Sequence, residues 1–128
     1  MFIIINVMAR ERLCDIAIGS SRQFEGLLES GNPVLAFFHM DGDVWKQAVE
    51  GLRRSRPILD YLDDKGIKVV SVDINRNIYL AAMQGALTSP HVMAFDVNGA
   101  KQGEVIGYSG SETLLDNLAK WYGWLDKY

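Results

Sequence analysis

Apolar residues along the chain switch between strand-like and helical spacing, with short polar turns between the segments. Residues 15–18 are a short strand candidate, and Ser20 or Ser21 offers an N-cap to a helix with apolar residues on one face. Residues 34–38 are apolar without alternation, which is typical of a strand buried on both faces of a sheet. This segment is therefore the predicted central strand.

The middle of the chain predicts a long helix, a second buried strand and a shorter helix. Apolar positions from about residue 44 to residue 64 follow helical spacing, with Pro57 inside the pattern, so we expect one long helix kinked at that proline. Residues 67–72 are rich in β-branched side chains and predict a strand. Residues 75–84 then predict the shorter helix.

The last third of the chain predicts a hairpin and a terminal helix. Residues 91–95 and 104–106 are strand candidates on either side of Asn98-Gly99, a strong hairpin signal. A helix opens at Ser111 and has an apolar stripe on one face. The predicted order is β-α-β-α-β-α-β-β-α, an α/β fold.

Composition narrows the class of protein. The chain has 128 residues, 48% of them hydrophobic, which fits a single domain that we expect over residues 15–128, preceded by an extension at 1–14. With 13 Lys and Arg against 16 Asp and Glu, the net charge of −3 gives no electrostatic reason to expect nucleic acid or an anionic membrane as partner.

The single cysteine and the first residues of the chain bear on the cellular compartment in which the protein is expected. Cys14 is the only cysteine and cannot form an internal disulfide, so a reducing, cytoplasmic location is expected. The apolar stretch 1–8 is too short to span a membrane and has no basic region before it, unlike a secretory signal.

Several segments resemble the thioredoxin fold family in order and spacing. They are the central strand at residues 33–38, the helix segment 57–62 with its proline, the strand 68–73, the stretch 85–99, and Gly107 after the last strand. The resemblance implies a three-layer α/β/α sandwich with a mixed central sheet of four or five strands. It also implies a cis peptide bond between Ser89 and Pro90.

The sequence departs from the family at the residues that carry the family's redox chemistry. Thioredoxins react through a Cys-x-x-Cys pair at the start of the long helix. Here the equivalent loop contains no cysteine. The family's buried acid falls at Phe37 and its partner lysine at Ser71, so the resemblance implies a redox-inactive relative. The residues of the active-site-loop equivalent are His39, Met40, Asp41, Gly42 and Asp43.

The family also binds peptides, and this surface is the leading functional candidate. The backbone before the family's cis-proline pairs with extended peptides, a form of β-augmentation. The sequence therefore predicts a non-catalytic adaptor, chaperone or assembly factor that binds a protein or peptide and needs no cofactor. The groove candidates are Ser89, Pro90, His91, Gly107, Tyr108 and Trp45.

Other interpretations remain open. Trp45 is either a groove anchor or a core residue, and Asp43 is a candidate helix cap. His39 and His91, with Asp41 and Asp43, would form a metal or acid–base site in an enzyme with non-thiol chemistry, if their side chains converge. A third alternative is a structural, oligomerising subunit, a possible homodimer, that associates through its edge strand or its C-terminal aromatic residues. These aromatic residues are Trp121, Tyr122, Trp124 and Tyr128.

Overall fold

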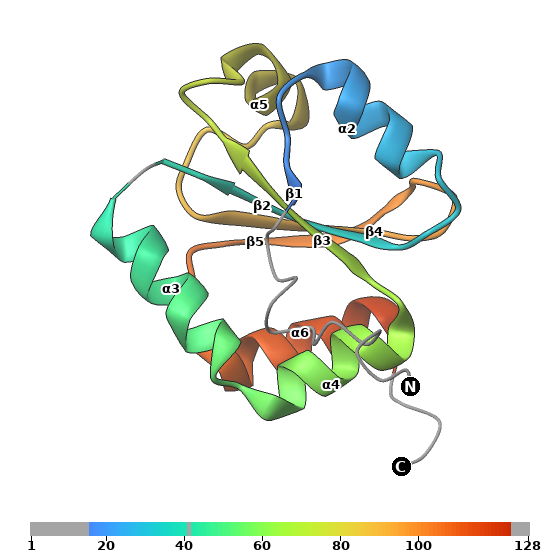
Figure 1. Ribbon diagram of the computed structural model, residues 1–128, viewed down its shortest axis with the longest axis vertical. Helices are drawn as coiled ribbons and strands as arrows, with labels where there is room; N and C mark the ends of the chain where they lie inside the picture. Colours follow the sequence, from blue (N-terminus) through green and yellow to red (C-terminus); the bar gives the residue numbers. More distant parts are fainter. Residues whose placement is uncertain (1–15, 41, 124–128) are drawn as a thin grey trace, which may run out of the picture.

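The computed structural model describes residues 16–40 and 42–123, and these form one mixed sheet with helices on both faces (Figure 1). The predicted extension at 1–14, together with Asp41, Trp124 and Tyr128, lies outside the described residues. The strands have the order β1-β3-β2-β4-β5. They are β1 (Ile16–Ala17), β2 (Val34–His39), β3 (Lys68–Asp73), β4 (His91–Phe95) and β5 (Lys101–Ile106).

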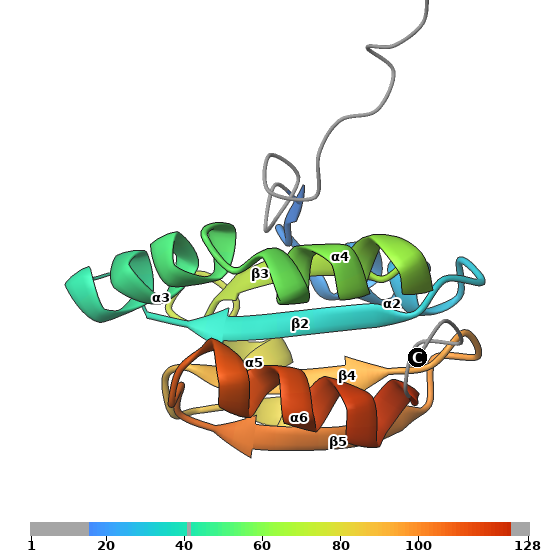
Figure 2. The same cartoon turned by 90° about the horizontal axis from the view of Figure 1, so that it is seen from below.

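The helices make two outer layers, which confirms the predicted three-layer sandwich. Helices α3, α4 and α6 cover one face of the sheet, and α2 and α5 cover the other (Figure 1). Figure 2 shows α3 and α4 beside β2 and β3, and α6 beside β4 and β5. The bounds are α2 (Ser21–Leu28), α3 (Asp43–Arg53), α4 (Arg56–Lys65), α5 (Ile78–Gln84) and α6 (Ser111–Tyr122).

Strand β2 is the centre of the sheet, as its unbroken apolar run predicts. All six of its residues are buried, and it pairs in parallel with β3 and antiparallel with β4. Because side chains alternate along a strand, Leu35 and Phe37 join the core under α3, α4 and α6. Ala36 and Phe38 join the second core, under α2 and α5.

The predicted long kinked helix is wrong in one respect, because the chain forms two helices instead. Helix α3 ends at Arg53, and Ser55 is extended before α4 begins. Pro57 lies in the first turn of α4, where its missing N–H needs no intrahelical partner. The proline therefore starts a new helix rather than bending an old one.

Other boundaries also differ from the sequence prediction. Helix α5 begins at Ile78 rather than at residue 75, because Asp73 holds the intervening turn: its carboxylate accepts from the Asn75 N–H at 2.9 Å. Strand β5 begins at Lys101 rather than at residue 104. The first residues of this edge strand are polar and exposed, so they lack an apolar strand pattern.

Side chains of α6 hold this helix against the sheet. The Trp121 indole occupies the space where a Cβ on Gly103 of β5 would lie. The Tyr122 hydroxyl donates to the carbonyls of Val34 and Phe95, at 2.9 and 3.2 Å, and burial raises the pKa of this phenol. Tyr122 thus satisfies carbonyls at paired ends of β2 and β4.

Adding one methyl group at Gly103 is expected to destabilise the protein. In Gly103→Ala the new Cβ overlaps the Trp121 ring, so α6 must shift, and we expect a loss of about 1–3 kcal/mol in the free energy of unfolding. Chemical denaturation of the purified variant measures this loss.

Gly26 provides the matched control, because it lies on the exposed side of α2 and a Cβ there would meet no atom within 4 Å. Gly26→Ala is expected to leave stability unchanged or raise it by up to about 1 kcal/mol. Equal stability of the two variants would show that Trp121 does not pack on Gly103 as described.

Candidate functional site

The candidate residues gather at one end of the sheet, which we call the loop end: residues 39, 40 and 42, residues 87–91 and residues 106–108. Strands β2 and β3 are parallel and both finish there, whereas β4 is antiparallel to β2 and starts there. Strand β5 is antiparallel to β4 and also finishes there. The topology therefore brings three loops from distant parts of the sequence together.

Two hydrogen bonds join these loops around Pro90. The Ser89–Pro90 peptide bond is cis. The Met40 N–H donates to the Ser89 hydroxyl oxygen at 3.0 Å, and the Gly107 N–H donates to the Pro90 carbonyl at 2.7 Å. The loop before β4 is therefore fixed from both sides.

Ser89 itself faces solvent. Pro90 beside it is buried, whereas Ser89 is exposed. Within residues 16–40 and 42–123, neither the backbone amide nor the backbone carbonyl of Ser89 forms a hydrogen bond. An unpaired backbone donor and acceptor on an exposed residue are what an added extended peptide requires.

Tyr108 lies beside this loop and packs inward. It is half-buried against the core under α3, and its hydroxyl lies 3.7 Å from the position of a Cβ on Gly51. Burial raises the pKa of the Tyr108 phenol. A small pocket beside the ring is lined by residues that include Val92, Gly107 and Thr113. The Tyr108 side chain is therefore packed against the core at the loop end rather than extended into solvent.

Trp45 packs on the core at the start of α3. Its ring stacks on His39 with a centroid distance of 4.4 Å and an interplanar angle of 4°. It also contacts the Phe37 ring at 5.7 Å with an angle of 47°. The geometry of this aromatic cluster is that of core packing, with one side of Trp45 still accessible to solvent.

The aromatic cluster lies where the family places its acid–base pair. Phe37 and Ser71, the positions that the resemblance assigns to the acid and the lysine, are direct partners in the β2–β3 register. Both are buried, with 1% and 9% of their surface exposed. An apolar ring and a hydroxyl thus take the place of an ionisable pair.

His91 forms a different polar group, on the opposite face of the sheet. Its Nε2 lies 2.8 Å from the Glu104 carboxylate, whose other oxygen accepts from Lys101 Nζ at 3.1 Å. The hydrogen bonds from Lys101 and from His91 lower the pKa of Glu104. An ionised carboxylate can only accept, so His91 carries its proton on Nε2.

The two histidines do not converge. His39 follows Leu35 and Phe37 on the face under α3 and stacks on Trp45. His91 precedes Met93 on the face under α2 and α5. A metal or acid–base site shared by His39 and His91 is therefore not formed.

Of the two acidic residues of the loop, Asp41 lies outside the described residues and Asp43 is described by its backbone alone. Asp43 is the first residue of α3 rather than its cap, which is Gly42. Residues 16–40 and 42–123 contain no group of three or more His, Cys, Asp or Glu side chains that could hold a metal ion. In the same ranges, no helix is both long enough and apolar enough to cross a membrane.

Solved structures of thioredoxins share this topology. The chain matches a mutant thioredoxin from Halobacterium salinarum NRC-1 with a TM-score of 0.64 and 20% identity, over 83% of this chain and 88% of that chain. It matches Trypanosoma brucei brucei thioredoxin with a TM-score of 0.66 and 19% identity, over 85% and 92%. The chain has the thioredoxin fold.

A third thioredoxin-fold relative is mitochondrial thioredoxin 3 of Saccharomyces cerevisiae in its oxidised form. The TM-score is 0.66 at 14% identity, over 85% of this chain and 94% of that chain. No family model and no curated protein sequence matches the chain. At these identities the likeness establishes the thioredoxin fold, while activity has to be argued from residues. With Cys14 as its only cysteine, the chain has no Cys-x-x-Cys pair.

The group formed by His91, Glu104 and Lys101 was not predicted from the sequence. Part of its signal lies in the hairpin, where the strands that leave the Asn98-Gly99 turn, after a register shift at Ala94/Phe95, place Met93 opposite Glu104. That register places His91 diagonally across from Glu104 on the same face. Lys101 was not expected in this group, because the predicted strand began only at residue 104.

Replacing Glu104 by Gln tests the electrostatic part of this group. Because the pKa of Glu104 is lowered in the folded protein, its contribution to stability is present above the ordinary value of 4.5 and is lost as the pH falls through the folded-state value. We expect Glu104→Gln to be less stable than the parent at neutral pH, and this difference to shrink in acid. Urea denaturation across this pH range measures it. A difference independent of pH would contradict the assignment.

Proposed function

We propose that this thioredoxin-fold protein is a non-catalytic adaptor or assembly factor that binds an extended protein segment at its loop end. The single observation that carries the proposal is at Ser89, an exposed residue whose backbone amide and carbonyl have no hydrogen-bond partner in the described part of the chain. An extended segment would pair with these groups as an added strand.

Two features support binding without dithiol chemistry. The chain has no cysteine pair, and Phe37 and Ser71 occupy the positions that the resemblance assigns to the family's acid and lysine. The hydrogen bonds to Ser89 and Pro90 nevertheless hold the loop in one conformation. A fixed loop loses little conformational entropy when a peptide binds, which favours affinity.

A peptide-binding measurement with a blocked loop tests the proposal. Random decapeptides on an array are probed with the labelled parent protein, and the best binder is then measured in solution by fluorescence anisotropy. In Ser89→Arg a long charged side chain replaces the small exposed hydroxyl beside the free backbone groups. We expect its affinity to fall at least about tenfold.

Ser30→Arg is the matched control. Ser30 is also an exposed serine, but it precedes β2 and so lies at the opposite end of the sheet. This variant is expected to bind like the parent, and circular dichroism verifies that both variants are folded. The proposal is wrong if the parent binds no decapeptide, or if both arginine variants bind equally well.

A further inference from the structure

Exposed apolar side chains are concentrated at the loop end. Helix α5 follows the end of β3 and leads into the loop before β4, so it belongs to this end of the sheet (Figure 1). Among the described residues, one large exposed hydrophobic side chain, Val97, lies at the opposite end, next to the hairpin turn. The others lie on α5, in the loops after β2 and α5, and at the last residue of β5: Met40, Ile78, Tyr79, Met83, Leu87 and Ile106.

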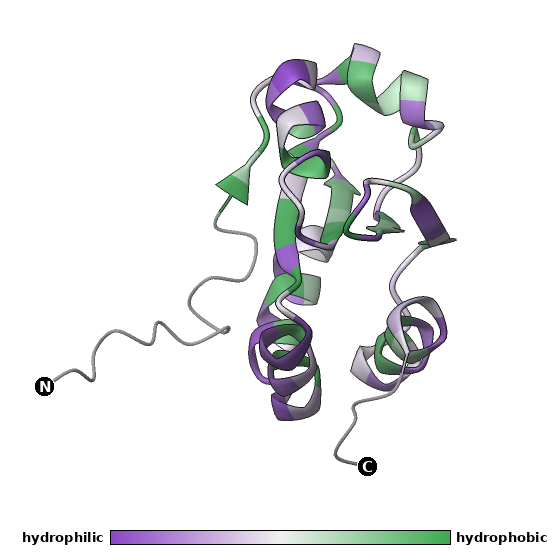
Figure 3. Cartoon of the chain, turned by 90° about the vertical axis from the view of Figure 1, so that its right-hand side faces the viewer, coloured by the Kyte–Doolittle hydropathy of each residue, from purple (hydrophilic) through white to green (hydrophobic). Residues whose placement is uncertain are grey.

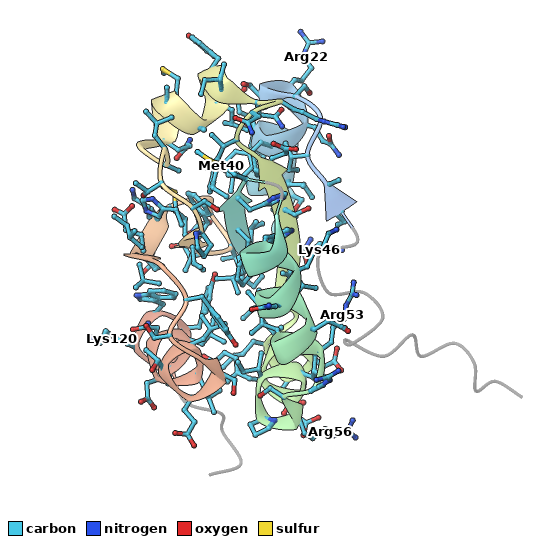
Figure 4. All side chains as sticks on the ribbon, turned by 90° about the vertical axis from the view of Figure 1, so that its left-hand side faces the viewer. Arg22, Met40, Lys46, Arg53, Arg56 and Lys120 are labelled. Atoms are coloured by element: carbon cyan, nitrogen blue, oxygen red, sulfur yellow. The ribbon has the colours of Figure 1, made fainter. Side chains whose placement is uncertain are left out.

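The positions of these side chains follow from contacts already described. Met40 is joined to Ser89 by a hydrogen bond, and Leu87 precedes Ser89 by two residues. Ile106 faces His91 in the β4–β5 register, directly before Gly107. In Figure 4, which looks at the loop end, Met40 lies beneath α5, whereas Lys46, Arg53 and Arg56 follow α3 and α4.

Helix α5 and the loop that follows it carry no charged residue. The uncharged stretch runs from residue 77 to residue 95, although 23% of the whole chain is charged. In Figure 3, α5 at the top is mostly green and white. The neighbouring charges are already paired, since Arg76 lies 3.7 Å from Asp73, and Glu104 is held by Lys101 and His91.

We infer that the partner segment is uncharged and apolar, and that α5 supplies the surface for its side chains. This inference rests on the proposed function, because the same segment would pair with the Ser89 backbone. Tyr79 and Met83 of α5 are 70% and 67% exposed, so both side chains offer apolar area to a partner. We call Tyr79, Met83 and Leu87 the α5 surface.

Two physical arguments decide the chemistry of the partner. A charged side chain buried against an uncharged surface loses its hydration without gaining a counter-charge, so charged segments are rejected. An extended segment presents every second side chain on the same side, so one row can contact the α5 surface while its backbone pairs at Ser89. The predicted ligand is therefore an extended, uncharged stretch of apolar residues, as unfolded proteins expose.

The same array of random decapeptides identifies the partner class. We expect the peptides that bind the parent to be enriched in uncharged, apolar sequences. For the best binder, Tyr79→Lys and Met83→Lys are expected to lower affinity by at least about tenfold, because each places a cation on the α5 surface. Val97→Lys is the matched control and is expected to bind like the parent, since Val97 is 51% exposed at the other end of the sheet.

The outcomes separate this inference from the proposed function. If charged peptides predominate, or if Tyr79→Lys and Met83→Lys bind like the parent while Ser89→Arg does not, the α5 assignment is overturned and the Ser89 groove stands. If the parent binds no decapeptide, both fail. If light scattering shows that the parent is a dimer and Met83→Lys a monomer, a second copy covers the α5 surface, which also overturns the inference.

Discussion

The burial of β2 on both faces is the constraint from which the architecture follows. A strand with six buried residues needs hydrogen-bonded neighbours on each side and an apolar layer on each face. Strands β3 and β4 meet the first need, and two separate helical layers meet the second. Most polar side chains then lie at the rim of the sheet, which is where the candidate site lies, and Ser71 is an exception inside β3.

The direction of each strand determines what the rim contains. Because β4 runs against β2, the start of one strand lies beside the end of the other, and Met40 reaches Ser89 across 49 positions of sequence. The same alternation of side chains that fills both cores sends His39 and His91 to opposite faces. Strand direction and side-chain alternation thus join the loops at one end of the sheet and keep the two histidines apart.

Sequence patterns predicted most of the fold but less of the site. Uninterrupted apolar runs predicted the central strands, because a strand buried on both faces has apolar side chains at nearly every position. The Asn98-Gly99 turn predicted the hairpin. The break at Ser55 was predicted as a kink, since apolar spacing continues across it, although Ser55 and Pro57 are also typical of a helix start. In α5, Leu80 is buried and Met83 exposed, and without charged residues to mark the solvent side, only the three-dimensional packing distinguishes them.

The pairing of Phe37 with Ser71 also has an evolutionary consequence. A single change of Phe37 to an acid would place a carboxylate in the core without a lysine beside it, at a cost of several kcal/mol. A lysine at position 71 alone would likewise be buried without a counter-charge. The two substitutions would be tolerated together, as an ion pair, more readily than either one alone. The packing around Phe37 therefore penalises each single step toward an ionisable pair at these two positions.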